Sequence, residues 1–245
     1  MKTIDCYWEK VNLNESCLEI DIAPDETIDE AVLIDAMEGY DYIVVKIDPF
    51  HYQNNAFLTR NGFIFMETQI SITKRFSDFD FSNKLISLIC KKVTFKEVTT
   101  NEGLNQVLES ISPNMFTTDR IFLDPHYSEE KGFVRYKNWI KTSFGKKDTH
   151  LYTFSVGNKA IGFGIYSEQA LGEWNYFLGG IYEKYQRMGF GLLTPASPFL
   201  YAKSMGLELS VVHTDISSNN MPVVKLYNSL NYSVTKFRYV FIKHK

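Results

Sequence analysis

Runs of alternating and helically spaced apolar residues divide the chain into strands and helices. In the first half the pattern predicts a helix over 25–37, strands over 42–47, 63–73 and 91–98, and helices over 54–59 and 101–112. In the second half it predicts a helix within 125–144, a three-stranded antiparallel meander over 151–156, 160–166 and 174–182, a helix to about 204, a strand over 207–213, a helix over 220–230 and a strand over 232–242. The pattern is typical of an α/β (α+β) protein.

A domain boundary is predicted near Pro113, because proline disfavours helix at the residue before it. An N-terminal α/β domain then covers 1–115 and a second domain covers 116–245. Each half has a β-branched strand, a doubled asparagine (Asn54-Asn55 or Asn219-Asn220), a helix, and a turn with an asparagine and an aromatic residue. The helix is about one turn shorter in the first half, so this echo leaves an internal duplication open.

Composition excludes several classes of function. The net charge is −3 with scattered Lys and Arg, which disfavours nucleic-acid binding, and no apolar run approaches the length of a membrane span. The three cysteines are too few and too widely spaced for a disulfide framework, which favours a soluble, cytoplasmic protein. The five histidines show no metal-binding spacing, and Walker and Rossmann fingerprints are absent, so we expect no metal.

One turn in the second half has the features of an anion site. An apolar strand leads into a turn over 186–191 that contains Gly189 and Gly191, and a helix follows. Backbone N–H groups at a helix start lack intrahelical partners and lie at the positive end of the helix dipole. Glycine lets an anion approach them, so the turn predicts a pyrophosphate site.

The turn is followed by a second helix from Asn220 that carries Tyr227, and then by Asn231-Tyr232. The order Gln-x-x-Gly-x-Gly, Asn-(x)6-Tyr and aromatic turn resembles the GNAT superfamily of acyl-CoA-dependent N-acyltransferases, over roughly 118–245. The resemblance implies a GNAT fold, a mixed and mostly antiparallel sheet flanked by helices, with a smaller, truncated GNAT-like N-terminal domain. Pro195 and Pro198 depart from the family pattern, so we expect the helix after the turn to start late or kink.

The resemblance also implies a set of acyl-CoA-binding residues. In the family the turn binds the CoA pyrophosphate, and the preceding strand splays at a bulge where its free backbone groups pair with pantetheine. Two adjacent glycines predict that bulge at Gly179–Gly180. Asn220 is equally suited to cap its own helix. The implied residues are Gly179, Gly180, Ile181, Gln186, Arg187, Met188, Gly189, Phe190, Gly191 and Asn220.

By the same resemblance, Tyr227 is the general acid that protonates the CoA thiolate as it leaves. The alternative interpretation is that Leu226-Tyr227 is only the apolar face of a helix. His213 and Asp215 are candidates for accepting the amine proton, although a histidine that ends a strand is commonly structural. Backbone N–H groups near Gly180 and Ile181 are expected to stabilise the oxyanion.

Looser sequence similarities bear on the identity of the acyl acceptor. The segments 120–127 and 62–69, with Tyr136-x-x-Trp139, resemble two-domain GNAT enzymes of the dTDP-fucosamine acetyltransferase type. That resemblance implies a dTDP-linked amino-dideoxysugar of bacterial surface-polysaccharide (O-antigen) biosynthesis as acceptor, and acetyl-CoA or 3-hydroxybutanoyl-CoA as donor. Arg120, Tyr136 and Trp139 are candidates for contacting the sugar nucleotide, or else belong to the core or rim.

Rival interpretations remain open. They are an N-acetyltransferase of a protein, an aminoglycoside or a polyamine, and a CoA-binding regulator without catalysis. A strongly acidic cleft would favour the cationic acceptors. The sequence leaves the oligomeric state, a homodimer included, undecided.

Overall fold

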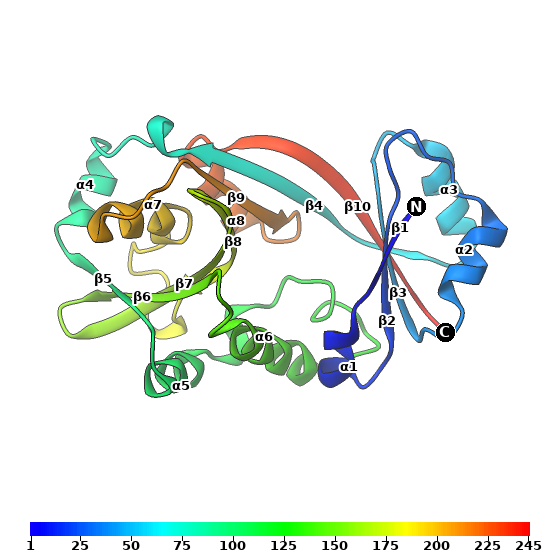
Figure 1. Ribbon diagram of the computed structural model, residues 1–245, viewed down its shortest axis with the longest axis horizontal. Coiled ribbons are helices and arrows are strands. Elements are labelled where there is room, and N and C mark those ends of the chain that lie inside the picture. The colour runs from blue at the N-terminus through cyan, green and yellow to red at the C-terminus, as the bar shows by residue number, and fades with distance from the viewer.

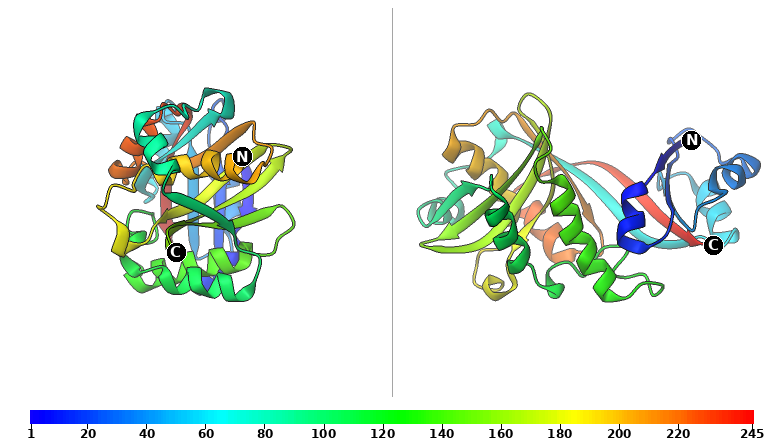
Figure 2. Two further views of the ribbon diagram at one scale, coloured as in Figure 1. Left: turned by 90° about the vertical axis from the view of Figure 1, so that its left-hand side faces the viewer. Right: turned by 60° about the horizontal axis from the view of Figure 1, so that its bottom comes forward.

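A computed structural model describes residues 1–245 as two lobes joined by long strands (Figure 1). The N-terminal lobe contains β1 (Lys2–Asp5), α1 (Tyr7–Leu13), β2 (Cys17–Asp21), α2 (Glu30–Met37), β3 (Tyr42–Ile47) and α3 (Tyr52–Arg60). The C-terminal lobe contains α4 (Lys84–Cys90), β5 (Val93–Glu97), α5 (Asn101–Ser110), α6 (Glu129–Ser143), β6 (Thr149–Val156), β7 (Lys159–Ala170), β8 (Glu173–Ile181), α7 (Leu193–Met205), β9 (Val211–Ser217) and α8 (Met221–Ser229). Strands β4 (Ile64–Arg75) and β10 (Ser233–His244) run side by side from one lobe to the other (Figures 1 and 2).

All ten strands form one sheet in the order β1-β2-β3-β10-β4-β9-β8-β7-β6-β5. Only β2–β3 and β8–β9 pair in parallel, and the other neighbours are antiparallel. This confirms the predicted fold class, a mixed and mostly antiparallel sheet flanked by helices. No helix is both long and apolar enough to cross a bilayer.

Side-chain caps set where several helices begin. Asp29 accepts hydrogen bonds from the N–H groups of Ala31 and Val32, so α2 starts at Glu30 rather than at residue 25 as predicted. Ser128 likewise caps α6 at the N–H of Lys131. These short-range bonds satisfy backbone donors that the helix itself leaves free.

The strand predicted over 207–213 lies further along the chain, as β9 at Val211–Ser217. Gly206, whose φ of 64° is left-handed, caps the C-terminus of α7, and the N–H of Leu207 still bonds to the carbonyl of Ala202. The N–H of Ser210 bonds to the carbonyl of Gly172 in the adjoining turn. The ladder of β9 therefore begins only at Val211.

The two lobes contain a repeated strand-helix-strand unit, β3-α3-β4 and β9-α8-β10. Each element of the second unit begins 169 residues after its counterpart (42 to 211, 52 to 221, 64 to 233), and the helices have nine residues each. The predicted difference of one helical turn is therefore wrong. Strand β3 pairs with β10, and β9 pairs with β4, so each unit completes its sheet with the other unit's last strand.

The register obeys the same relation. Ile47 of β3 faces Tyr239 of β10, and the residues 169 positions away, Ile216 and Ile70, face each other between β9 and β4. The β4–β10 pair has two bulges, in which Met66 and Thr235 are the extra residues, again 169 apart. The repeat is thus a pseudo-two-fold arrangement about the β4–β10 pair.

Part of the sequence echo follows this repeat and part does not. Gly62 and Asn231 are equivalent and left-handed, with φ of 78° and 54°, and a buried aromatic residue follows each. The doubled asparagines are not equivalent: Asn220 caps α8, whereas Asn54 lies inside α3, which His51 caps.

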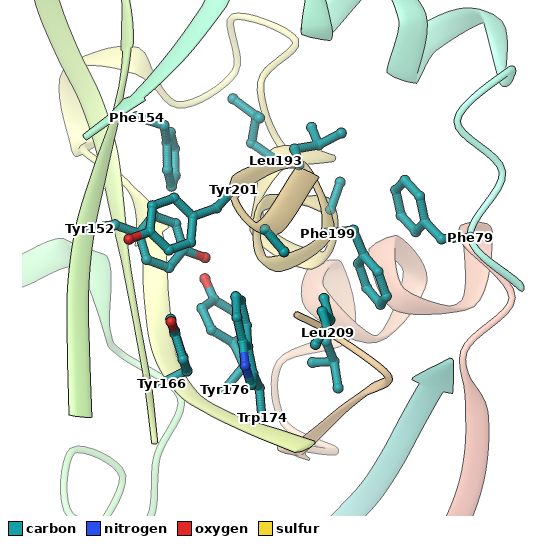
Figure 3. Close-up of a cluster of buried hydrophobic side chains, with 14 of the residues drawn as sticks. Phe79, Tyr152, Phe154, Tyr166, Trp174, Tyr176, Leu193, Phe199, Tyr201 and Leu209 are labelled. Carbon is teal, nitrogen blue, oxygen red and sulfur yellow. The ribbon is translucent and has the colours of Figure 1, made fainter. Parts of the chain in front are cut away.

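The largest buried cluster packs α7 against the C-terminal part of the sheet (Figure 3). Tyr201 of α7 stacks on Tyr152 with ring centroids 4.2 Å apart, and Tyr166 stacks on Trp174 at 3.8 Å. A second cluster packs α5 and α6 on the opposite side, and two more cover the N-terminal sheet. The predicted boundary after residue 115 stays a prediction; α5, which precedes it, shares a cluster with α6, which follows it.

Candidate functional site

The central feature is a gap between the parallel strands β8 and β9. They pair only from Glu173 to Asn175, opposite Val211 to His213. Beyond Asn175, β8 continues along β7 to Ile181 while β9 stays with β4. One edge of β8 is therefore left without a strand neighbour.

The bulge in β8 lies at Phe177, between Tyr176 and Leu178, and the prediction of a bulge at Gly179–Gly180 is wrong. Both glycines pair regularly with β7. The reason for a glycine at 179 is steric, because a Cβ there would overlap the phenol oxygen of Tyr176. At Gly180 a Cβ would make only ordinary contacts, 3.7 Å from Met115.

The ladder shows which backbone groups face the gap. The N–H of Tyr182 donates to the carbonyl of Ile161 on β7, so by antiparallel alternation Gly180 also bonds to β7, while Gly179 and Ile181 face the open side. The carbonyl of Ile181 accepts a hydrogen bond from Nε2 of Gln186 at 3.2 Å. The backbone of Gly179 is thus available to an extended ligand, and the predicted oxyanion donor at Gly180 is already engaged with β7.

The turn before α7 leaves six consecutive backbone donors, 187–192, without a protein acceptor; the N–H of Gln186 bonds to Glu183. Arg187 and Gly189 have positive φ values of 61° and 85°. Leu192 gives α7 no side-chain cap. Such a run of donors at a helix N-terminus suits an anion.

The glycines of the turn differ in their surroundings. Nothing lies within 4 Å of a Cβ built on Gly189, whereas one on Gly191 would lie 3.4 Å from Leu226. As expected, α7 starts late, at Leu193, so Pro195 falls in its first turn. Pro198 lies inside the helix and has no N–H to donate to the carbonyl of Thr194, four residues earlier. The hydroxyl of Ser197 lies 3.5 Å from that carbonyl oxygen.

A cavity of about 410 Å³ opens beside the gap, and its walls come from both lobes. Its lining includes Lys46, Glu67, Gln69, Phe116, Thr118, Asp119, Arg120, Arg135, Tyr136, Trp139, Phe177, Gly179, Thr214, Asp215, Asn220 and Tyr227. The repeat explains this meeting of the lobes, because β4 of the first unit is hydrogen-bonded to β9 of the second.

Tyr227 lines the cavity and is 4% exposed. Burial, with Tyr176 nearby, raises the pKa of its phenol well above the ordinary value, and the Thr214 hydroxyl opposes this shift. The phenol therefore keeps its proton at neutral pH. Asn220 accepts a hydrogen bond from the N–H of Val223 at 3.3 Å and also lines the cavity, so it is both a cap and a wall residue.

The two predicted proton acceptors lie in the middle of β9, not at its end. Asp215 lines the cavity and accepts a hydrogen bond from the Ser71 hydroxyl at 2.5 Å. His213 is exposed and does not line the cavity. The structure thus brings Asp215, but not His213, to the same cavity as Tyr227.

The three predicted acceptor residues all line the cavity. Tyr136 stacks on Phe116 at 4.4 Å, and Trp139 stacks on Phe177 at 5.3 Å. Arg120 forms no ion pair or hydrogen bond with protein, and its Nε is buried without a partner. Burial alone would lower the pKa of the Arg120 guanidinium, but the nearby Tyr42 phenol and glutamate carboxyl groups outweigh it and hold that pKa well above its ordinary value.

The other two cations of the cavity are already paired. Lys46 bonds to Glu19 at 2.9 Å, and Arg135 bonds to Glu9 and lies 3.4 Å from Asp119. Arg120 is therefore the cation of this cavity left for a ligand.

Sequence reasoning did not single out Glu67 as a site residue. This carboxyl group on β4 is 8% exposed, lines the cavity, and its Oε2 is buried without a hydrogen-bond partner. The same strand also carries Gln69 and Ser71, so no local pattern distinguished Glu67 from a polar residue that faces solvent.

No family model and no curated protein matches this chain. Solved structures do match. A functionally unknown conserved protein from Staphylococcus epidermidis has a TM-score of 0.63 at 13% identity, covering 94% of this chain and 85% of that one. A GCN5-related N-acetyltransferase from Kribbella flavida has a TM-score of 0.58 at 13% identity, covering 93% and 81%. A tandem GNAT protein from the clavulanic acid biosynthesis pathway has a TM-score of 0.56 at 10% identity, covering 93% and 75%. Together with the splayed β8–β9 pair and the helix that follows the glycine turn, these similarities show that the chain has a GNAT fold.

Proposed function

We propose that the protein is an acyl-CoA-dependent N-acyltransferase. The observation that carries the proposal is the run of free backbone donors at 187–192, beside the open edge of β8 and the cavity with Tyr227. The donors suit the CoA diphosphate, and the backbone of Gly179 suits the pantetheine amides, as an added strand would pair. This arrangement directs the thioester toward the cavity.

The proposed chemistry is direct transfer. A neutral amine attacks the thioester carbonyl carbon, the C–N bond forms, and the C–S bond breaks as the thiolate leaves. The phenol of Tyr227 gives its proton to the sulfur. The amine proton passes to a carboxylate of the cavity, and we assign this role to Glu67, because its Oε2 has no other partner, with Asp215 as the second candidate.

We further propose a dTDP-linked amino-dideoxysugar as acceptor, with acetyl-CoA or 3-hydroxybutanoyl-CoA as donor. The support is Arg120, a cation without a protein partner that suits a diphosphate, and the aromatic planes of Tyr136 and Trp139, which suit a base or sugar ring. The cavity has three acidic groups and three basic ones, so it is not the strongly acidic cleft that polyamines or aminoglycosides would favour.

The test is to incubate the protein with acyl-CoAs and a panel of amines that includes dTDP-amino sugars, and to follow thiol release and product mass. We expect turnover with the anionic sugar nucleotides, and its loss in Arg120→Ala through a raised KM. A matched control is Arg60→Ala, at the exposed end of α3. CoA binding without thiol release from any amine would instead favour a CoA-binding regulator.

A further inference from the structure

Three potential metal ligands from separate segments meet outside the acceptor cavity. Glu15 lies between α1 and β2, His126 lies before α6, and His244 ends β10; one ligand atom of each lies within 4.8 Å of the others. None of the three lines the cavity. The proposed transferase chemistry therefore does not account for them.

His244 is held as a metal ligand would be. Its Nε2 lies 2.8 Å from Oδ2 of Asp124, a carboxyl group that is 3% exposed. A carboxylate only accepts hydrogen bonds, so Nε2 carries the proton and Nδ1 has a free lone pair. That Nδ1 is buried without a hydrogen-bond partner.

The carboxyl group of Glu15 is likewise held in place by a hydrogen bond from a buried neighbour. The phenol of Tyr127, itself 6% exposed, donates to Oε2 of Glu15 at 2.6 Å. The other oxygen, Oε1, lies 3.3 Å from Nε2 of His126. One oxygen is thus fixed from outside the cluster, and the other is directed into it.

The charge of the cluster favours a cation. Glu15 and Asp124 form no ion pair with a lysine or arginine; Glu15 lies beside His126 and Asp124 beside His244, and a neutral imidazole brings no positive charge. The nearby Lys131 is engaged elsewhere, because its Nζ donates to the carbonyl of Leu13 at 3.0 Å. A bound cation would supply the missing positive charge.

We propose that Glu15, His126 and His244 bind one divalent transition-metal ion of the zinc class. Two imidazoles and one carboxylate are a common donor set for such ions. Asp124 and Tyr127 are the outer partners that fix ligand orientation. His126 now stacks on His244 with centroids 4.0 Å apart, and its half-exposed side chain is free to turn a ring nitrogen toward the ion.

The ion would join the end of β10 to the segment that carries Arg120. That segment continues from the cavity wall at Asp119 and Arg120 directly to Asp124, His126 and Tyr127. A metal here would hold the cavity wall against the N-terminal lobe. This role does not depend on which reaction the cavity performs.

The test is to titrate the metal-free protein with zinc chloride by calorimetry, and with cobalt(II) chloride by visible absorption. We expect one ion per chain and a cobalt spectrum with nitrogen ligands. Tyr127→Phe should weaken zinc binding roughly 10- to 100-fold, as loss of an outer partner does elsewhere. His126→Ala, at an exposed position, should weaken it at least as much.

The matched control is His150→Ala. His150 forms a histidine–carboxylate pair with Glu97 at 2.8 Å but has no third ligand beside it. Thermal melting checks that each variant is folded. Absence of zinc and cobalt binding to the unmodified protein would overturn the proposal, as would binding that survives both substitutions or that His150→Ala abolishes equally.

Discussion

Two neighbouring tyrosines allow the proposed general acid to be tested against a matched control. Tyr227 and Tyr232 contact each other edge to face with centroids 4.7 Å apart, and both are almost fully buried. Tyr227 lines the cavity, whereas the phenol of Tyr232 donates to the carbonyl of Pro195 at 2.6 Å. The same substitution, Tyr→Phe, therefore removes a reacting group at one position and a structural hydrogen bond at the other.

The two substitutions should change different quantities, kcat in Tyr227→Phe and the free energy of unfolding in Tyr232→Phe. Tyr227→Phe keeps the ring that packs in the core, so the free energy of unfolding should change little, while loss of a general acid should lower kcat roughly 100-fold or more, about 2.7 kcal/mol of barrier. Tyr232→Phe leaves a buried carbonyl with one bond fewer and should cost about 1 kcal/mol of stability, with kcat nearly unchanged.

The assays are steady-state thiol release, calorimetry with CoA, and denaturant unfolding of both variants. CoA affinity should stay close to that of the unmodified protein in Tyr227→Phe. Equal loss of kcat in both variants, or a fall in CoA affinity that matches the fall in kcat, would refute the assigned role of Tyr227.

Three further predictions concern the base, the turn and the buried phenols. Glu67→Gln should lower kcat roughly 100-fold in the thiol-release assay; if Asp215→Asn has that effect and Glu67→Gln does not, the assignment of the base is wrong. Gly189→Ala must hold a side chain at φ 85° and places a methyl group on the open face of the turn. Calorimetry should therefore show CoA binding weakened about tenfold, or about 1.4 kcal/mol. The control Gly145→Ala, at φ 79° after α6, should cost similar stability but leave CoA binding intact. Burial raises the pKa of Tyr176 to about 12, so stability should be full below the free-tyrosine pKa of about 10 and fall as pH rises from there toward 12, measured by denaturant unfolding at each pH; equal stability at pH 8 and pH 11.5 would contradict it.

Local patterns predicted those elements whose formation depends on neighbours in the sequence. The strand over 42–47 matches β3, and Asn220 caps α8 as its residue type suggests. In each case the decisive contact follows from strand alternation or from a cap within one helical turn.

Long-range pairing is what the sequence did not reveal. Exchange of β4 and β10 between the lobes depends on registers between residues that are far apart, as in Ile70 with Ile216. The position of Glu67 in the cavity depends on that exchange, so no local pattern could mark it. The Phe177 bulge escaped prediction because one of the two glycines, Gly179, serves another need, room for the ring of Tyr176.

The repeat also indicates why one lobe, and not both, would bind acyl-CoA. The strand before the second unit, β8, pairs with β9 over three residues and then separates, but the strand before the first unit, β2, stays paired with β3 along its whole length, from Cys17 to Asp21. Backbone donors before α2 are also used: the N–H of Ile22 bonds to Lys46, and Asp29 caps the helix. The first unit therefore has neither an open strand edge nor a run of free donors, and its contribution is the wall of the cavity at Lys46 and Glu67. Calorimetry with CoA should accordingly give one site per chain, and a second site that persists in Gly189→Ala would show that the N-terminal unit binds the ligand as well.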